Sequence, residues 1–315
     1  MKRPIALVFP LVALLWAIVL LACPRVAQAA TPVTGGNIIN QTWTLAGSPY
    51  IVQGDIVVPA TTKLTIQAGV EVQFATTDGL MTGKDTSEVE MTIRGTLEVQ
   101  GTAASPVNFR STSSGAGQWY GVVVDASTAV LTTTELVVQH AQYGFHVVDV
   151  APTLSGFTAH TNTYGVYYTG TGGGAITDAV IRNNSSRGVY VSSSGAGSVS
   201  LALTNATLNQ NGSYGLYTYT SSPTLTVTVT NSIVTNTSYG IYREVGGGPS
   251  SVTVTYSDVW GNGTNYAGTS AGTGSILANP LYVSSSNLRL TSNSPARFAS
   301  AAGTDIGALP YTSDA

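Results

Sequence analysis

The side chains best suited to proton transfer are the histidines, of which the chain has three in 315 residues. Four polar residues stand four to six positions before a glycine that recurs along the chain: His140, His160, Arg182 and Asn183. Histidine titrates near neutral pH and arginine can neutralise a carboxylate, so such an edge could act on an acidic polymer. The alternative is that these four residues only occupy turns, because turns accept polar residues freely and no acidic partner is fixed beside them. His146 is expected to be an outward strand residue.

Two glutamates hold equivalent places in a repeat. Residues 64–73 align with residues 91–100 at a constant offset, and four apolar positions match. This alignment predicts that Glu71 lies over Glu98 on adjacent coils, about 5 Å away, a separation that suits a retaining glycosidase pair or a shared cation. The alternative is that the two glutamates form a solvent-exposed ladder without a function. The other acids are scattered and Cys23 is the single cysteine, so no metal site and no disulfide is predicted.

Tyrosine recurs two residues past the repeated glycine, at Tyr167, Tyr190, Tyr217 and Tyr242. If Val189 and Val191 face inward, the alternation of a strand places these rings on the solvent side. Stacked on successive coils, they could bind the apolar faces of sugar rings. The alternative is a self-stacking ladder that only stiffens the molecule.

The glycines themselves recur at intervals of 23, 21, 23, 27 and 25 residues, each followed by an apolar residue: Gly121, Gly144, Gly165, Gly188, Gly215 and Gly240. That period is typical of one turn of a three-sided β-helix. An asparagine precedes four of the glycines, at Asn162, Asn184, Asn211 and Asn236. Like residues on coils about 4.8 Å apart are expected to form a ladder of amide hydrogen bonds. The run 170–175 fits a dinucleotide-binding pattern, but no helical sequence follows it, so a loop is predicted.

These patterns predict an all-β protein, a single-stranded right-handed parallel β-helix solenoid. At roughly 24 residues per coil, residues 31–315 allow about eleven or twelve coils. We expect one domain, with N-terminal coils over 31–118, glycine-aromatic repeat coils over 119–270 and a C-terminal capping segment over 271–315.

Residues 1–30 have the features of an export signal: a basic start, an apolar run over 5–22, and the small-residue site Ala27-Gln28-Ala29. Cleavage would leave Ala30 or Thr31 first. Leu20-Leu21-Ala22-Cys23 offers an alternative, a lipoprotein signal that ends at Cys23. Only 9% of residues are charged and the net charge is −3, so no nucleic-acid partner is predicted. Pro10 within the apolar run, the basic start and the cleavage site favour a removed signal, so no membrane span is expected in the mature chain.

Several segments carry a family resemblance. They are Trp43 with Ser48-Pro49-Tyr50, Gly54 to Pro59, Gly101-Thr102, Pro106 to Phe109, Trp119-Tyr120-Gly121, Asn279 to Tyr282 and Asp305 to Ala308. The chain resembles exported bacterial parallel β-helix repeat proteins of the pectin-lyase-like superfamily. That superfamily includes polysaccharide lyases, glycoside hydrolases and adhesins, so the resemblance implies a fold and leaves the chemistry open. The lyases of this superfamily resemble one another in pairing a basic residue with acidic calcium ligands, and the pectin hydrolases in clustering aspartates. Neither pattern is present in this sequence.

The sequence therefore favours an exported, non-catalytic β-helix protein of the cell surface or medium. Its expected partner is an extracellular polysaccharide or a cell-surface component, bound along the tyrosines, and no cofactor is expected. The alternative is a polysaccharide lyase or glycoside hydrolase acting on uronate-containing polymers, with His140, His160 and Arg182 as its candidate residues.

Overall fold

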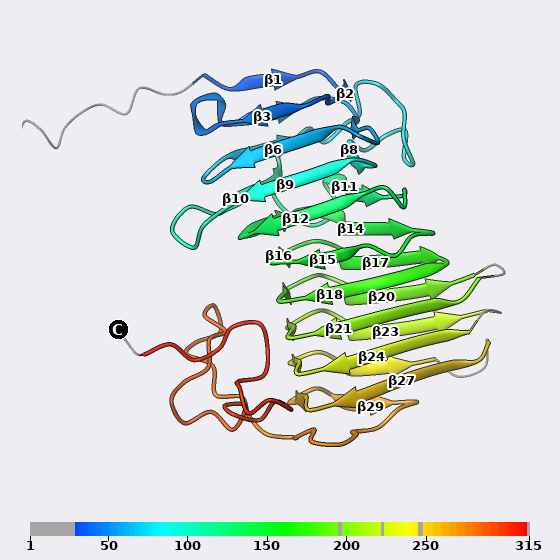
Figure 1. Cartoon of the computed structure of the whole chain (residues 1–315), viewed down its shortest axis with the longest axis vertical. Helices are drawn as coiled ribbons and strands as arrows, with labels where there is room; N and C mark the ends of the chain where they lie inside the picture. The colour runs from blue at the N-terminus through cyan, green and yellow to red at the C-terminus, as the bar shows by residue number, and fades with distance from the viewer. Residues whose placement is uncertain (1–28, 195–196, 222–223, 245–247, 314–315) are drawn as a thin grey trace, which may run out of the picture.

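The computed structural model describes residues 29–194, 197–221, 224–244 and 248–313. They form a right-handed parallel β-helix, a rod of stacked coils (Figure 1). The predicted signal segment up to residue 28, including Cys23, lies outside the described residues. Within the described ranges the one helical element is the short turn η1 (Leu45–Gly47).

Each coil contributes strands to three faces, except the last, which has only β28 (Asp258–Trp260) and β29 (Thr264–Ala267). Face A has ten strands: β1 (Thr31–Val33), β4 (Tyr50–Val52), β7 (Glu71–Phe74), β10 (Val107–Ser111), β13 (Leu136–Gln139), β16 (Phe157–His160), β19 (Val180–Arg182), β22 (Thr207–Asn209), β25 (Ile233–Thr235) and β28 (Asp258–Trp260). Face B also has ten: β2 (Gly36–Asn37), β5 (Ile56–Val58), β8 (Glu90–Ile93), β11 (Trp119–Val124), β14 (Ala141–Val148), β17 (Tyr164–Gly170), β20 (Arg187–Ser193), β23 (Tyr214–Thr220), β26 (Tyr239–Arg243) and β29 (Thr264–Ala267).

Face C consists of two successive sheets, seen at the front of Figure 1. The first contains β3 (Gln41–Trp43), β6 (Lys63–Gln67), β9 (Thr96–Gln100) and β12 (Val130–Thr134). The second contains β15 (Thr153–Ser155), β18 (Gly172–Thr177), β21 (Val199–Thr204), β24 (Leu225–Thr230) and β27 (Ser250–Thr255). The loop predicted for residues 170–175 is wrong: Gly170 ends β17, and residues 172–175 lie within β18.

The core is narrow and apolar because alternate residues of each strand point inward. Val189 and Val191 of β20 are fully buried, and so are Leu225, Val227 and Val229 of β24. Tyr190 lies between the two valines and is only half-buried, as the alternation predicted. Since all the strand pairs are parallel, the same inward position recurs from coil to coil and the buried side chains form continuous columns.

The rod has about nine turns, fewer than the eleven or twelve expected. The period was right, but the residues after β29 do not build further coils. Ile276 pairs with Asp258 of the last coil, and the chain then folds back outside face A, where the Ala308 amide donates to Thr207 Oγ1 at 3.0 Å. Figure 1 shows this segment, in orange and red, beside the lower coils. The segment expected to cap the rod therefore also covers part of one face.

The predicted stacking of Glu71 over Glu98 is wrong. Glu71 lies on face A, where it pairs with Asn108, while Glu98 lies on face C between Thr65 and Thr132. The alignment of 64–73 with 91–100 matched the strand pair β6–β7 to β8–β9, but β8 stacks on β5 and β9 stacks on β6. Any two strand–turn–strand units share this alternation, so the alignment matched strands that lie on different faces of the rod.

A ladder of buried asparagines runs along one corner, as predicted. The Asn162 and Asn184 amides donate to the Oδ1 atoms of Asn184 and Asn211 at 3.0 and 3.2 Å. Each of the three side chains also donates to a carbonyl of the preceding coil. A Cβ at Gly165 or Gly188 would lie within 3.0 Å of both this ladder and the next coil's backbone. The recurring glycine therefore leaves the room that the asparagines need.

The ladder continues differently from the prediction at its C-terminal end. Asn236 is exposed and has a φ of 59°, the turn position held by Asn183 one residue before the ladder. Thr237 and then Asn262 continue the ladder, and the Thr237 amide donates to Asn262 Oδ1. Asparagine suits both a left-handed turn and a ladder, so sequence spacing alone placed this residue one position too early.

Candidate functional site

Two outward columns of aromatic rings run down face B. The first contains the predicted Tyr167, Tyr190, Tyr217 and Tyr242, which pair in register on consecutive strands. The second was not predicted and contains Tyr143, Tyr164, Arg187, Tyr214 and Tyr239. We call these nine residues the tyrosine face. The missed signal was the residue just before each recurring glycine, which is a tyrosine at five of the six glycines and Arg187 at the sixth.

The rings stack on one another in the N-terminal half of the tyrosine face. Tyr167 and Tyr190 are nearly parallel, with ring centroids 4.8 Å apart and planes 12° apart. Their facing surfaces are closed to a ligand, so this half presents ring edges and hydroxyls. Burial raises the pKa of Tyr167 to about 12, which keeps its hydroxyl protonated as a hydrogen-bond donor.

The stack of the first column is interrupted once, between Tyr190 and Tyr217, whose planes are tilted by 54°. Beyond this break the column neighbours are nearly parallel again, Tyr217 with Tyr242 at 21° and Tyr214 with Tyr239 at 20°. A tilted neighbour covers less of a ring than a parallel one, so ring faces are less covered at the break than along the rest of the column. The Tyr217 hydroxyl donates to Glu244, which fixes that ring.

His146 closes the N-terminal end of the tyrosine face. It pairs with Tyr167 in register and stacks on it at 5.0 Å. His146 lies in the outward column, as expected of an outward strand residue, but neighbouring side chains bury it: Nδ1 lies 2.9 Å from the Tyr120 hydroxyl and Nε2 lies 2.9 Å from Thr169 Oγ1. Burial, helped by the charge of Lys84, lowers its pKa to about 4, so it is neutral at neutral pH. His146 therefore supports the rings.

The predicted histidine edge lies on face A and its adjoining corner. His160 and Arg182 are register partners, and His140 occupies the turn position with a φ of 68°. Burial first, and the charge of Arg182 second, lower the pKa of His160 to about 4. Arg182 donates to Asn183, and His160 Nδ1 lies 2.9 Å from Thr161 Oγ1. In the described ranges none of the three forms an ion pair or hydrogen bond with a carboxylate, so they have no proton-relay partner there.

The two glutamates of the predicted pair are each held by a cation. Arg110 Nη2 lies 2.6 Å from Glu71, and Lys63 forms an ion pair with Glu98. They lie on different faces and form no shared site.

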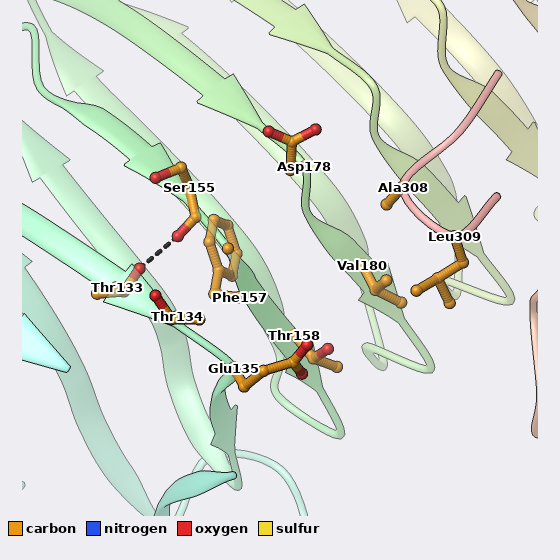
Figure 2. A pocket seen from close by; sticks show the side chains of 11 residues that line it. Thr133, Thr134, Glu135, Ser155, Phe157, Thr158, Asp178, Val180, Ala308 and Leu309 are labelled. Atoms are coloured by element: carbon orange, nitrogen blue, oxygen red, sulfur yellow. Dashed lines mark hydrogen bonds between the residues drawn. The ribbon is translucent and has the colours of Figure 1, made fainter. Parts of the chain in front are cut away.

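A shallow hollow of about 370 Å³ lies where face C turns into face A, beside the C-terminal segment (Figure 2). Glu135 and Asp178 bring carboxylates to it, with Ala308 and Leu309 on one side. Both acids are exposed and no basic residue lines the hollow. It contains none of the predicted site residues.

Among the described residues, no three His, Cys, Asp or Glu side chains gather closely enough to hold a metal ion. That part of the chain also has no helix long and apolar enough to cross a membrane.

Two family models match the sequence. The model described as a right handed beta helix region matches residues 98–254, and that of a pectate-lyase like beta helix domain matches residues 36–151. Among curated proteins, none matches significantly. The crystal structure of pectate lyase Pel9A aligns with a TM-score of 0.43 and 12% identity over 91% of this chain and 98% of that one. The chain is a right-handed parallel β-helix repeat protein, and the pectate-lyase like match covers its N-terminal coils.

Proposed function

We propose that this protein is exported and binds an extended polysaccharide along the tyrosine face, without cleaving it. The observation that carries the proposal is the register of eight tyrosines in two columns on consecutive strands, on a face that a long chain could follow. Coils about 4.8 Å apart place a ring at roughly every sugar length along the rod axis.

The stacking geometry changes the expected mode of binding. Where rings cover one another, the ligand meets hydroxyls and ring edges, which favours hydrogen bonds to sugar hydroxyls. Sugar faces can pack only where column neighbours tilt apart, as Tyr190 and Tyr217 do. A flat site without a deep pocket converts area into affinity poorly, so we expect a Kd in the range of about micromolar to millimolar.

The test is a titration of neutral and acidic polysaccharides against the wild type and a variant with Tyr190→Ala and Tyr217→Ala. The matched control carries Thr228→Ala and Thr253→Ala, two exposed register partners on face C. We expect the tyrosine variant to lose most of its binding and the control to keep it. Equal binding by all three proteins would exclude the tyrosine face.

A second variant separates the hydroxyls from the stack. Tyr190→Phe with Tyr242→Phe keeps the rings and removes two hydroxyls, so it should weaken binding while the melting temperature stays close to that of the wild type. This variant also guards against reading a folding defect of the alanine variant as a binding defect.

The enzyme alternative stays testable in the same samples. If the wild type shortens a uronate polymer, and His160→Ala abolishes this while the tyrosine changes do not, the protein is a lyase or hydrolase and the binding proposal is wrong.

A further inference from the structure

Arg187 interrupts the second aromatic column of the tyrosine face. It pairs in register with Tyr164 on one side and Tyr214 on the other, and Tyr143 and Tyr239 continue the column beyond them. Tyrosine is accommodated at this position on the coils above and below. A purely structural column could therefore have continued with tyrosine, and the arginine adds a positive charge at its centre.

The guanidinium is surrounded by aromatic rings. Its Cζ lies 4.4 Å from the ring centroid of Tyr190 and 4.7 Å from that of Tyr217, and within 5.5 Å of Tyr164 and Tyr214. Nη1 donates to the Tyr164 hydroxyl at 3.2 Å. Packing between rings holds the planar group in place and removes part of its hydration, which makes it a stronger donor to an incoming anion.

The charge of Arg187 has no acidic partner in the described parts of the chain. Of the nine basic residues described, Lys63, Lys84, Arg94 and Arg110 form an ion pair, and Arg187 is one of the five that form none. Its Nε is shielded from solvent and has no hydrogen-bond partner there either. The neighbouring Glu244 is bound by the Tyr217 hydroxyl and lies beyond ion-pair distance of Arg187.

We propose that Arg187 is a subsite for an anionic substituent, a carboxylate or a sulfate ester, on the polysaccharide bound along the tyrosine face. This inference rests on the proposed function and narrows its ligand to an acidic glycan. Arginine presents parallel N–H donors that match the two oxygens of such a group. The tyrosines on both sides would bind the uncharged parts of the same chain.

The rival explanation is that Arg187 is only a cation–π brace between coils. Two substitutions separate the explanations. Arg187→Tyr completes the column and removes the charge, while Arg187→Lys keeps the charge and loses the planar fork. Melting temperatures of both variants report any bracing role independently of binding.

The experiment measures binding of three derivatives of one extended backbone: hydroxyethyl cellulose, carboxymethyl cellulose and cellulose sulfate. We expect the wild type to bind at least one anionic derivative about tenfold or more tighter than the neutral one, with a preference that weakens in salt. Arg187→Tyr should lose that preference, and Arg187→Lys should keep part of it. The two anionic arms tell carboxylate from sulfate.

The other outcomes contradict either the Arg187 subsite alone or binding along the tyrosine face as well. If the wild type binds all three derivatives equally, or if Arg187→Tyr keeps the anionic preference, the subsite is wrong while binding along the tyrosine face stands. If the wild type binds none of the three derivatives, and none of the panel used to test the proposed function, both proposals fail together.

Discussion

Single residues define how closely the coils can stack. The ladder asparagines satisfy backbone amides that a corner of the rod would otherwise leave buried and unpaired. A similar device at another corner uses serine: the Ala206 and Ser232 amides donate to Ser232 Oγ and Ser257 Oγ, both at 3.1 Å. The sequence did not indicate this serine ladder, because serine is abundant in the loops of the chain.

Asn184→Ala should lower the free energy of unfolding by about 1 to 3 kcal/mol, because the Asn162 amide loses its partner and the Ala159 carbonyl loses the hydrogen bond from Asn184. Asn236→Gly is the control, since that residue is exposed in a left-handed turn that glycine adopts freely. Its change should stay within about 0.5 kcal/mol. Denaturant melts measure both, and equal losses in the two variants would refute the ladder assignment.

Gly188→Ala should be destabilising by at least about 1 to 3 kcal/mol, measured in the same melts. A Cβ there would lie 2.6 Å from the Gly215 carbonyl oxygen and 2.7 Å from Asn211 Nδ2, and neither group can move without breaking the ladder or the sheet. The control is Ala202→Gly on face C, a small-residue change away from the ladder. Gly303→Ala would not serve, because the φ of 73° at Gly303 disfavours alanine. A Gly188→Ala protein as stable as the wild type would contradict this packing.

At the scale of elements, the glycine period and the alternation predicted the strands, the parallel stacking and the outward tyrosines, because both depend on local geometry. The pairing of coils was harder to predict. The offset of residues 64–73 to 91–100 respected the alternation and still placed Glu98 on the wrong face, since one strand–turn–strand unit resembles the next. The C-terminal segment was missed for the opposite reason: its contacts with face A are specific and have no period.

Asp258 marks the contact between the last coil and that C-terminal segment. The side chain is fully buried, Oδ1 accepts from the Ala278 amide at 3.2 Å and Oδ2 has no partner among the described residues. Burial raises the pKa of Asp258 to about 7 from its usual 3.8. The folded pKa exceeds the unfolded one, so stability from this group is full below about pH 4 and falls as the pH rises to about 7.

Asp258→Asn should therefore match the wild type near pH 4 and become more stable than it toward pH 8. The shift corresponds to a difference on the order of 4 kcal/mol above pH 7. Comparing variant with wild type at each pH is necessary because His146 and His160, whose pKa values are lowered, change stability in the opposite direction over the same range. A variant whose melting temperature follows the wild type at every pH would show that Asp258 is not the titrating group.

At the scale of the whole molecule, the parallel register turns one coil's side chains into columns that run along the rod. On face B this brings together tyrosines that lie more than twenty residues apart in sequence. Such a surface suits a long, thin ligand outside the cell, in keeping with the export signal proposed for residues 1–30.

Export with removal of that signal predicts a defined N-terminus. Mass spectrometry of the secreted protein should find Ala30 or Thr31 as the first residue. A diacylated Cys23 would instead identify the chain as a lipoprotein.

The most direct test of binding along face B is oxidative footprinting of tyrosines, with and without a saturating acidic polysaccharide. Oxidation of each tyrosine is read by mass spectrometry, and Tyr256, outside the tyrosine face, serves as the internal reference. We predict that Tyr190, Tyr214, Tyr217 and Tyr242 become protected while Tyr256 does not. Equal oxidation of these four tyrosines with and without the saturating polysaccharide would contradict the account.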